Sequence, residues 1–240
     1  MKIFQQGNLG QFRKVFEAPA ACCETVAQSL VSSIFDEFET AVLVRIFLTI
    51  PFGQLPPANR QAVLSLADAH KVGAQVDERT PVLSLLATRG RRPSWNDRRL
   101  SRGHAGVPLV SASFVETIPM IARMLHEFGL GTGWVDAAGG PDFIVSKLGS
   151  LSVLFFVPDA ATHTDDAGRK VIAAQDFVKA YDIKSVFGVG GAYVDGSVCA
   201  VLCFTCESFD VQVAKKYEGL ANMFKAATVR HVTTGAIFAS

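Results

Sequence analysis

The stretch from Ile183 to Ala227, IKSVFGVGGAYVDGSVCAVLCFTCESFDVQVAKKYEGLANMFKAA, decides the fold. Two apolar runs flank Asp195-Gly196, a dipeptide that favours a type I′ turn because both central residues of that turn need positive φ. We therefore predict a β-hairpin in which Gly188 lies opposite Cys203. Both faces of the hairpin are apolar, which predicts a sheet that is covered on both sides.

One face of the predicted hairpin is built from small residues. In this register it carries Val186, Gly188, Gly190, Ala192, Cys199, Val201, Cys203 and Thr205. Such a face lets a helix or a bound ligand approach the backbone closely. Ser208 is placed to cap a helix after the hairpin, and apolar residues recur along that helix with helical spacing at Val213, Tyr217, Leu220 and Phe224.

Hydrophobic periodicity predicts further elements upstream. Helical spacing indicates helices over 19–38, 58–70 and 113–128, and a shorter one within 171–181. Runs that are apolar on both faces predict buried strands at 41–50, 80–88 and 151–157. Pro119 conflicts with a helix that starts at Ser113 and favours a start nearer Ile118. Residues 1–18 are polar and glycine-containing, and we expect a loosely attached N-terminal arm.

Helices and strands alternate without an internal repeat or a low-complexity linker, which predicts a single domain over 19–240. The predicted fold class is α/β (α+β), with a central mixed or antiparallel sheet of about five strands and helices on both faces. The closing hairpin argues against an all-parallel sheet.

Composition excludes several classes of protein. The chain is 49% hydrophobic with a net charge of +1, which excludes wholesale disorder and a globally basic nucleic-acid binder. The N-terminus lacks the apolar core of a signal peptide, and the longest apolar run, 41–52, is too short to span a bilayer. Five cysteines fit a reducing compartment better than a disulfide framework. We therefore expect a cytoplasmic protein with no membrane partner.

The order of strand, D-G turn, strand and closing helix over Ala173 to Val229 resembles the carboxyl-terminal half of a GAF domain. Ala21 to Phe52 fits the opening helix and first strand of that family less specifically. The chain is longer than a usual GAF domain, through an enlarged insertion at about 89–150. The resemblance implies a non-catalytic sensor or regulatory module that binds a small molecule and forms a homodimer through its terminal helices. Family ligands include cyclic nucleotides, tetrapyrroles and haem, so the cofactor stays open.

Six arginines crowd around Trp95 in the segment RGRRPSWNDRRLSRGHAG, residues 89–106. Guanidinium groups and an indole suit a small anionic ligand with a planar ring. The candidate ligand-binding residues are Trp95, Asn96, Asp97, Arg98, Arg102 and His104, with Gly188 and Gly190 on the hairpin. The ligand would lie on the small-residue face or between the sheet and residues 89–128. The alternatives are a solvated loop whose arginines pair with carboxylates elsewhere, an acidic partner and, less favoured, nucleic acid.

Cys203 and Cys206 form a C-x-x-C, with Cys199 nearby. Residues three apart on a strand point to opposite faces, so this pair does not jointly bind a metal on a regular strand. We expect these cysteines to be buried structural thiols, and the three are weak candidates for a metal site or a redox role. Two functional alternatives to a sensor therefore stay open: a dimerisation or interaction scaffold without a ligand, and a GAF-fold redox enzyme that uses cysteines.

Overall fold

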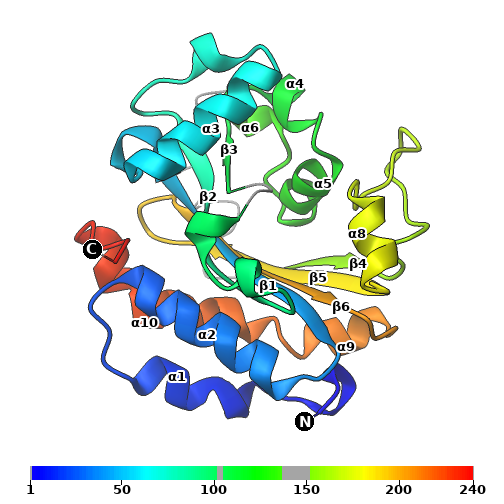
Figure 1. The fold of residues 1–240 in the computed structure, drawn as a ribbon. Coiled ribbons are helices and arrows are strands. Elements are labelled where there is room, and N and C mark those ends of the chain that lie inside the picture. The colour runs from blue at the N-terminus through cyan, green and yellow to red at the C-terminus, as the bar shows by residue number, and fades with distance from the viewer. Residues whose placement is uncertain (1, 102–104, 137–151, 240) are drawn as a thin grey trace.

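A computed structural model describes residues 2–101, 105–136 and 152–239. Within these residues the chain forms one six-stranded sheet with the order β3-β2-β1-β6-β5-β4, and all neighbouring strands are antiparallel (Figure 1). The strands are β1 (Ala41–Pro51), β2 (Pro81–Gly90), β3 (Gly106–Pro108), β4 (Val153–Val157), β5 (Ser185–Ala192) and β6 (Val198–Thr205). The predicted fold class is confirmed: the sheet is antiparallel with helices on both faces, and it has one strand more than the five expected because β3 was not predicted.

Helices cover both faces of this sheet (Figure 1). On one face, α2 (Cys23–Glu37) and α10 (Gly219–Thr233) pack against alternate residues of the central strands. On the other face lie α4 (Ala112–Val115), α5 (Pro119–Glu127) and α8 (Gln175–Ala180). All residues of β5 and β6 are buried, as predicted for a sheet that is covered on both sides.

The β5–β6 hairpin forms, but its predicted register is wrong by one residue. The Tyr193 N–H donates to the Ser197 carbonyl at 2.8 Å, so the loop has three residues and ends at Gly196, whose φ is +80°. Gly188 consequently lies opposite Leu202, not Cys203. A shift of one residue exchanges the two faces of β6. Gly188 and Gly190 therefore do not share a face with Cys199 and Cys203.

Two predicted helices are each divided in two. The helix predicted over 113–128 consists of α4, which is capped by Ser111, and α5, which begins at Pro119. Proline suits the first turn of a helix, where its missing N–H costs no hydrogen bond. The closing helix consists of α9 (Val211–Lys215) and α10, and its first cap is Asp210 rather than Ser208. The Asp210 carboxylate accepts from the Gln212 N–H at 2.8 Å.

The N-terminal segment packs against the domain instead of forming the loosely attached arm that we expected. It contains η1 (Phe4–Gln6), η2 (Leu9–Phe12) and α1 (Arg13–Glu17). Phe4 and Phe12 are fully buried in the core cluster around α2 and α10. The Glu207 carboxylate accepts from the Phe4 N–H at 2.7 Å, and the Tyr217 hydroxyl donates to the Phe4 carbonyl at 2.6 Å. Aromatic burial and these hydrogen bonds hold the segment in place.

The edge of the sheet beside β2 is covered by irregular structure. Strand β3 pairs only with Val82 to Ser84 among the residues described. Farther along β2, two short 3-10 helices take its place, η5 (Pro93–Trp95) and η6 (Arg98–Leu100). The remaining helical elements are α3 (Pro57–Ala69), α6 (Gly133–Asp136), η3 (Phe52–Gln54) and η4 (Gly73–Gln75). Residues 93–100, which contain η5 and η6, carry four of the eight predicted ligand-binding residues.

Candidate functional site

A cleft of about 410 Å³ lies between the sheet and the helices on the α5 side. Its floor comes from β1 and β6, and its walls come from Trp95, the start of α5, and the segment that leads into α8. The lining residues are Leu43, Arg45, Phe47, His70, Trp95, Thr117, Ile118, Pro119, Met120, Val171, Ile172, Ala173, Ala174, Phe177, Leu202 and Phe204. This is the space between the sheet and residues 89–128 where the sequence analysis expected a ligand.

Among the described residues that line the cleft, Arg45 is the one that carries a full charge at neutral pH. It lies on β1 between Leu43 and Phe47, and β1 is hydrogen-bonded to a strand on each side. Burial lowers the pKa of Arg45 to about 10, which leaves the guanidinium protonated at pH 7. Its Nη2 donates to the Ser101 hydroxyl at 3.0 Å. A paired central strand thus holds a cation at the floor of an apolar cleft.

Arg45 was not predicted as a site residue, although the sequence contains a signal for it. The run AVLVRIFLTI over 41–50 is apolar except for this arginine and Thr49. A charged residue in the middle of a buried strand is rare unless it is paired or functional. The interruption was therefore visible, but nothing local showed that the cleft lies above it.

Aromatic rings form one wall of the cleft. The Trp95 ring centroid lies 5.5 Å from that of Phe177 and 4.9 Å from that of Tyr181. Phe177 in turn contacts Phe204 edge to face, with centroids 5.6 Å apart. The Arg92 guanidinium lies over the Trp95 ring at 5.6 Å and hydrogen-bonds the Tyr181 hydroxyl. Of the residues predicted at η5 and η6, Trp95 is the one that the structure places in the cleft lining.

The other predicted residues of this segment have structural partners. The Asn96 side chain accepts from the Gly90 N–H at 2.9 Å, and Asp97 caps η6. The hydrogen bond from Arg99 holds the pKa of the Asp97 carboxyl below its ordinary value. Asp97 thus orients Arg99. Arg102 and His104 lie outside the described residues.

Arg98, another of the candidate ligand-binding residues, pairs with a carboxylate of the protein itself. Its side chain is 8% exposed and binds both carboxylate oxygens of Glu24, at 2.7 and 3.0 Å. Its Nη1 donates to the Asn59 side chain at 2.9 Å. Arg89 and Arg99 also pair with carboxylates, those of Asp36 and Asp97. For these three arginines, pairing with carboxylates is the correct interpretation.

The hairpin glycines make room for protein side chains. A Cβ on Gly190 would collide with the Phe128 ring and lie 2.7 Å from the Cys199 carbonyl oxygen. A Cβ on Gly188 would collide with the Leu202 side chain. The close approach that the small residues predicted therefore occurs, and the described residues that approach are Phe128 and Leu202.

The cysteines do not converge. Cys199 and Cys203 face α2 and α10, whereas Cys206 packs at the opposite face and contacts Arg91. Burial raises the pKa of Cys199 to about 11, and burial also raises the pKa of the Cys203 thiol. Thiols held protonated are poor nucleophiles and poor metal ligands. Among the described residues, no three His, Cys, Asp or Glu side chains are arranged to hold a metal ion.

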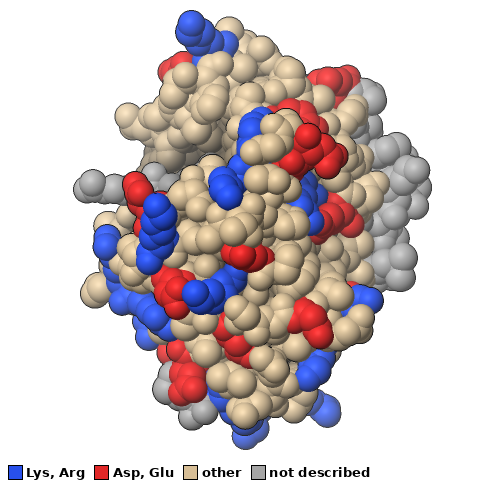
Figure 2. All heavy atoms as spheres, turned by 90° about the vertical axis from the view of Figure 1, so that its right-hand side faces the viewer, with Lys and Arg blue, Asp and Glu red and all other residues tan. Residues whose placement is uncertain are grey.

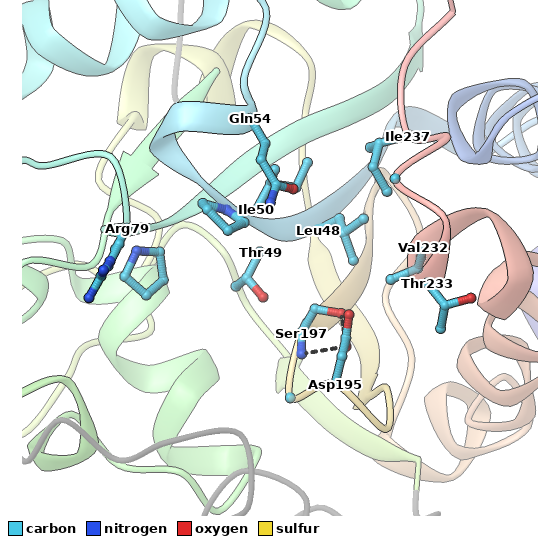
Figure 3. Close-up of a pocket in the computed structure, with 14 residues that line it drawn as sticks. Leu48, Thr49, Ile50, Gln54, Arg79, Asp195, Ser197, Val232, Thr233 and Ile237 are labelled. Atoms are coloured by element: carbon cyan, nitrogen blue, oxygen red, sulfur yellow. Dashed lines mark hydrogen bonds between the residues drawn. The ribbon is translucent and has the colours of Figure 1, made fainter.

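A second cleft, of about 600 Å³, lies at the far end of the hairpin (Figure 3). It is lined by the end of β1, the hairpin loop and the residues that follow α10. Arg79 and Asp195 stand apart in this view, and the Asp195 carboxylate is used by Ser197, whose N–H and hydroxyl both donate to it. The charged groups of this cleft therefore do not meet at one point, and we regard the Arg45 cleft as the candidate site.

The surface carries charges of both signs. Figure 2 shows lysines and arginines interspersed with aspartates and glutamates over the face turned to the viewer. In the part of the chain that the structure describes, no helix combines the length and the apolar character needed to cross a membrane.

Comparisons with known proteins give a partial similarity to solved structures. No protein-family model matches the chain, and no curated protein matches it. Among solved structures, the phycoerythrobilin-bound GAF domain from a cyanobacterial phytochrome is similar at 11% identity, with a TM-score of 0.44, over 94% of this chain and 92% of that one. A similarity at this level assigns no ligand to the present chain.

Proposed function

We propose that the chain is a non-catalytic sensor module that binds a small organic anion in the Arg45 cleft. The observation that carries this proposal is the placement of one guanidinium at the floor of a cleft that is otherwise lined mainly by apolar and aromatic side chains. Ligand sites are typically apolar cavities with a few convergent polar groups that fix orientation. A protonated arginine on a paired strand supplies such a group for a carboxylate or a similar anion.

The cleft favours a singly charged anion that carries an apolar or aromatic body. Arg45 is the fully charged side chain of the described lining, and a second charge on the ligand would be left among Leu43, Phe47 and Phe204. An unpaired charge in an apolar site is costly. Trp95 and Phe177 offer rings against which a planar ligand can stack. Aromatic monocarboxylates therefore fit the lining better than nucleotides or polyphosphates.

A thermal-shift screen tests this proposal. The panel contains benzoate, 1-naphthoate and indole-3-carboxylate, with inorganic phosphate and adenosine monophosphate as polyanions, at matched ionic strength. We expect aromatic monocarboxylates to raise the melting temperature of the wild type and of Arg99→Met, because Arg99 is 71% exposed and lies outside the cleft lining. Arg45→Met and Trp95→Leu should lose that response. An equal response in all four proteins would place the site elsewhere.

The dimer alternative depends on the terminal helices, whose apolar stripes are used inside the domain. Val26, Leu30 and Ile34 of α2 are buried in the core, and so are Leu220 and Phe224 of α10. The described structure therefore adds no support for a homodimer through these stripes. Sedimentation of the purified chain at tens of micromolar, roughly the range for a weak interface, decides between monomer and dimer.

The redox alternative gains no support from the cysteine placement described above, because Cys199 and Cys203 lie on one face of the sheet and Cys206 on the other. All five cysteines are free, which supports our proposal of a reducing compartment such as the cytoplasm. The mixed charges in Figure 2 favour a small-molecule ligand over nucleic acid.

A further inference from the structure

The segment η5–η6 joins the cleft to the C-terminal residues. Its middle residue, Arg98, is bound to Glu24 in the first turn of α2 and to Asn59 of α3. Its guanidinium also lies 4.7 Å from the Phe238 ring centroid. Asn59 is itself buried and donates to Ser84 of β2 at 3.3 Å. Arg98 is thus a junction of α2, α3, β2 and the C-terminal segment, here defined as residues 236–239.

The C-terminal segment is docked on the first turn of α2 (Figure 1). The carbonyls of Ala236 and Ile237 accept from the N–H groups of Cys23 and Glu24, at 2.9 and 2.8 Å. These N–H groups have no partner within the helix, so the segment acts as its cap. The Ala239 N–H donates to the Glu24 carboxylate at 2.9 Å. Glu24 therefore binds Arg98 and the segment with the same carboxylate.

Two residues connect η5–η6 to the cleft, one by lining it and the other through Arg45. Trp95 lines it, and Ser101 accepts the hydrogen bond from Arg45. The Trp95 ring packs with the core cluster on the α5 side of the sheet, whereas Phe238 packs with the cluster on the α2 side. The segment passes from one side to the other at the edge of β2 that β3 leaves uncovered, and the Gly90–Asn96 hydrogen bond fixes it there. A displacement of η5–η6 therefore alters the cleft and the packing of the C-terminal segment together.

We propose that occupation of the cleft and docking of the C-terminal segment are coupled through η5–η6. This proposal rests on the proposed function for the identity of the ligand site. An anion that binds Arg45 and packs on Trp95 holds η5–η6 through both of these residues. With η5–η6 held in this position, Arg98 keeps its ion pair with Glu24 and its contact with the Phe238 ring, and these contacts favour the docked C-terminal segment. Coupling between two sites is reciprocal, so undocking the segment must weaken binding in the cleft by the same factor.

Trp95 fluorescence tests the coupling without a ligand. The chain has two tryptophans, so Trp134→Phe leaves Trp95 as the emitter. In this background, the acrylamide quenching constant of Trp95 is compared among the parent, Phe238→Ala, a variant that lacks residues 236–240, and Val229→Ala. Val229 is a 38% exposed apolar residue of α10 and serves as the control for losing a side chain in the same region.

We expect the quenching constant to rise in Phe238→Ala and in the truncated variant and to stay unchanged in Val229→Ala. Titration with 1-naphthoate should show an affinity that falls by about 5-fold or more in the same two variants, the usual range for coupled sites. An unchanged quenching constant in both variants would overturn the coupling. If quenching rises but 1-naphthoate and the other aromatic carboxylates bind none of the proteins, the coupling holds and the proposed function fails.

Discussion

Replacing Gly190 by alanine probes the packing of the hairpin against the helical layer. The added Cβ would lie 2.7 Å from the Cys199 carbonyl oxygen and still closer to two ring carbons of Phe128. The carbonyl belongs to a strand that is paired on both sides, so it cannot move away cheaply. Overpacking a dense core costs about 1–3 kcal/mol. Loss of glycine freedom in the unfolded chain returns about 0.4–1 kcal/mol. We therefore expect Gly190→Ala to lower the free energy of unfolding by about 1–2 kcal/mol.

Urea denaturation followed by circular dichroism measures this change, with Gly133→Ala as the matched control. A Cβ on Gly133 meets no atom within 4 Å, and the residue lies in α6, so that variant should be neutral or more stable by about 0.5 kcal/mol. In the background Phe128→Leu, part of the clash disappears, and the Gly190→Ala effect should shrink by about 0.5 kcal/mol or more. A free energy of unfolding for Gly190→Ala within about 0.5 kcal/mol of the wild type would refute the packing described here.

Three further predictions concern stability. Arg98→Met should lower the free energy of unfolding by about 3 kcal/mol because it leaves the half-buried Glu24 carboxylate without its guanidinium, whereas the exposed Arg99→Met should change it by under about 0.5 kcal/mol in the same denaturation assay. Burial raises the pKa of Cys23 to about 12 and that of Cys199 to about 11, from an ordinary 9.0. The contribution of the two neutral thiols to the free energy of unfolding is therefore complete below pH 9 and is lost as the pH rises toward the folded pKa values. A melting temperature that falls no faster above pH 9 in the wild type than in the double variant Cys23→Ala/Cys199→Ala would contradict this. Glu207→Gln should free residues 2–7 for limited proteolysis, because it weakens the hydrogen bonds to the Phe4 and Gln5 N–H groups and to the Thr40 hydroxyl, and cleavage no faster than in Glu218→Gln would contradict it.

The position of the hairpin was predictable from the sequence, but its register was not. Asp195-Gly196 suits a two-residue loop and also the three-residue loop that forms, because both place Gly196 at positive φ. A contact distant in sequence accompanies the observed register: the Val198 N–H donates to the Thr49 hydroxyl of β1 at 2.7 Å. No local pattern reveals a partner 149 positions away. Because side chains alternate along a strand, the wrong register assigned the β6 side chains to the wrong faces of the sheet in the prediction.

The candidate site was predictable in part for the same reason. The arginine-rich segment drew attention to Trp95 and to the space beside it, and Trp95 does line the cleft. Arg98 stood in the same cluster, but its partner Glu24 lies 74 residues earlier, and only the fold brings the two together. Arg45 was visible as a charge within an apolar run, yet its role depends on α5 and residues 171–174, which close over it from later in the sequence.

The central claim is that Arg45 selects an anionic group in the cleft, and pairs of ligands that match in shape but differ in charge test it most directly. In the Trp134→Phe background, Trp95 emission is titrated with benzoate, 1-naphthoate and indole-3-carboxylate and with their uncharged primary amides. A hydrogen bond to a charged partner contributes about 1.5–3 kcal/mol, which corresponds to a preference of about 10-fold or more for the carboxylate. We predict that preference in the parent protein and its loss in Arg45→Met. An equal preference in both proteins, or none in the parent, would contradict the account.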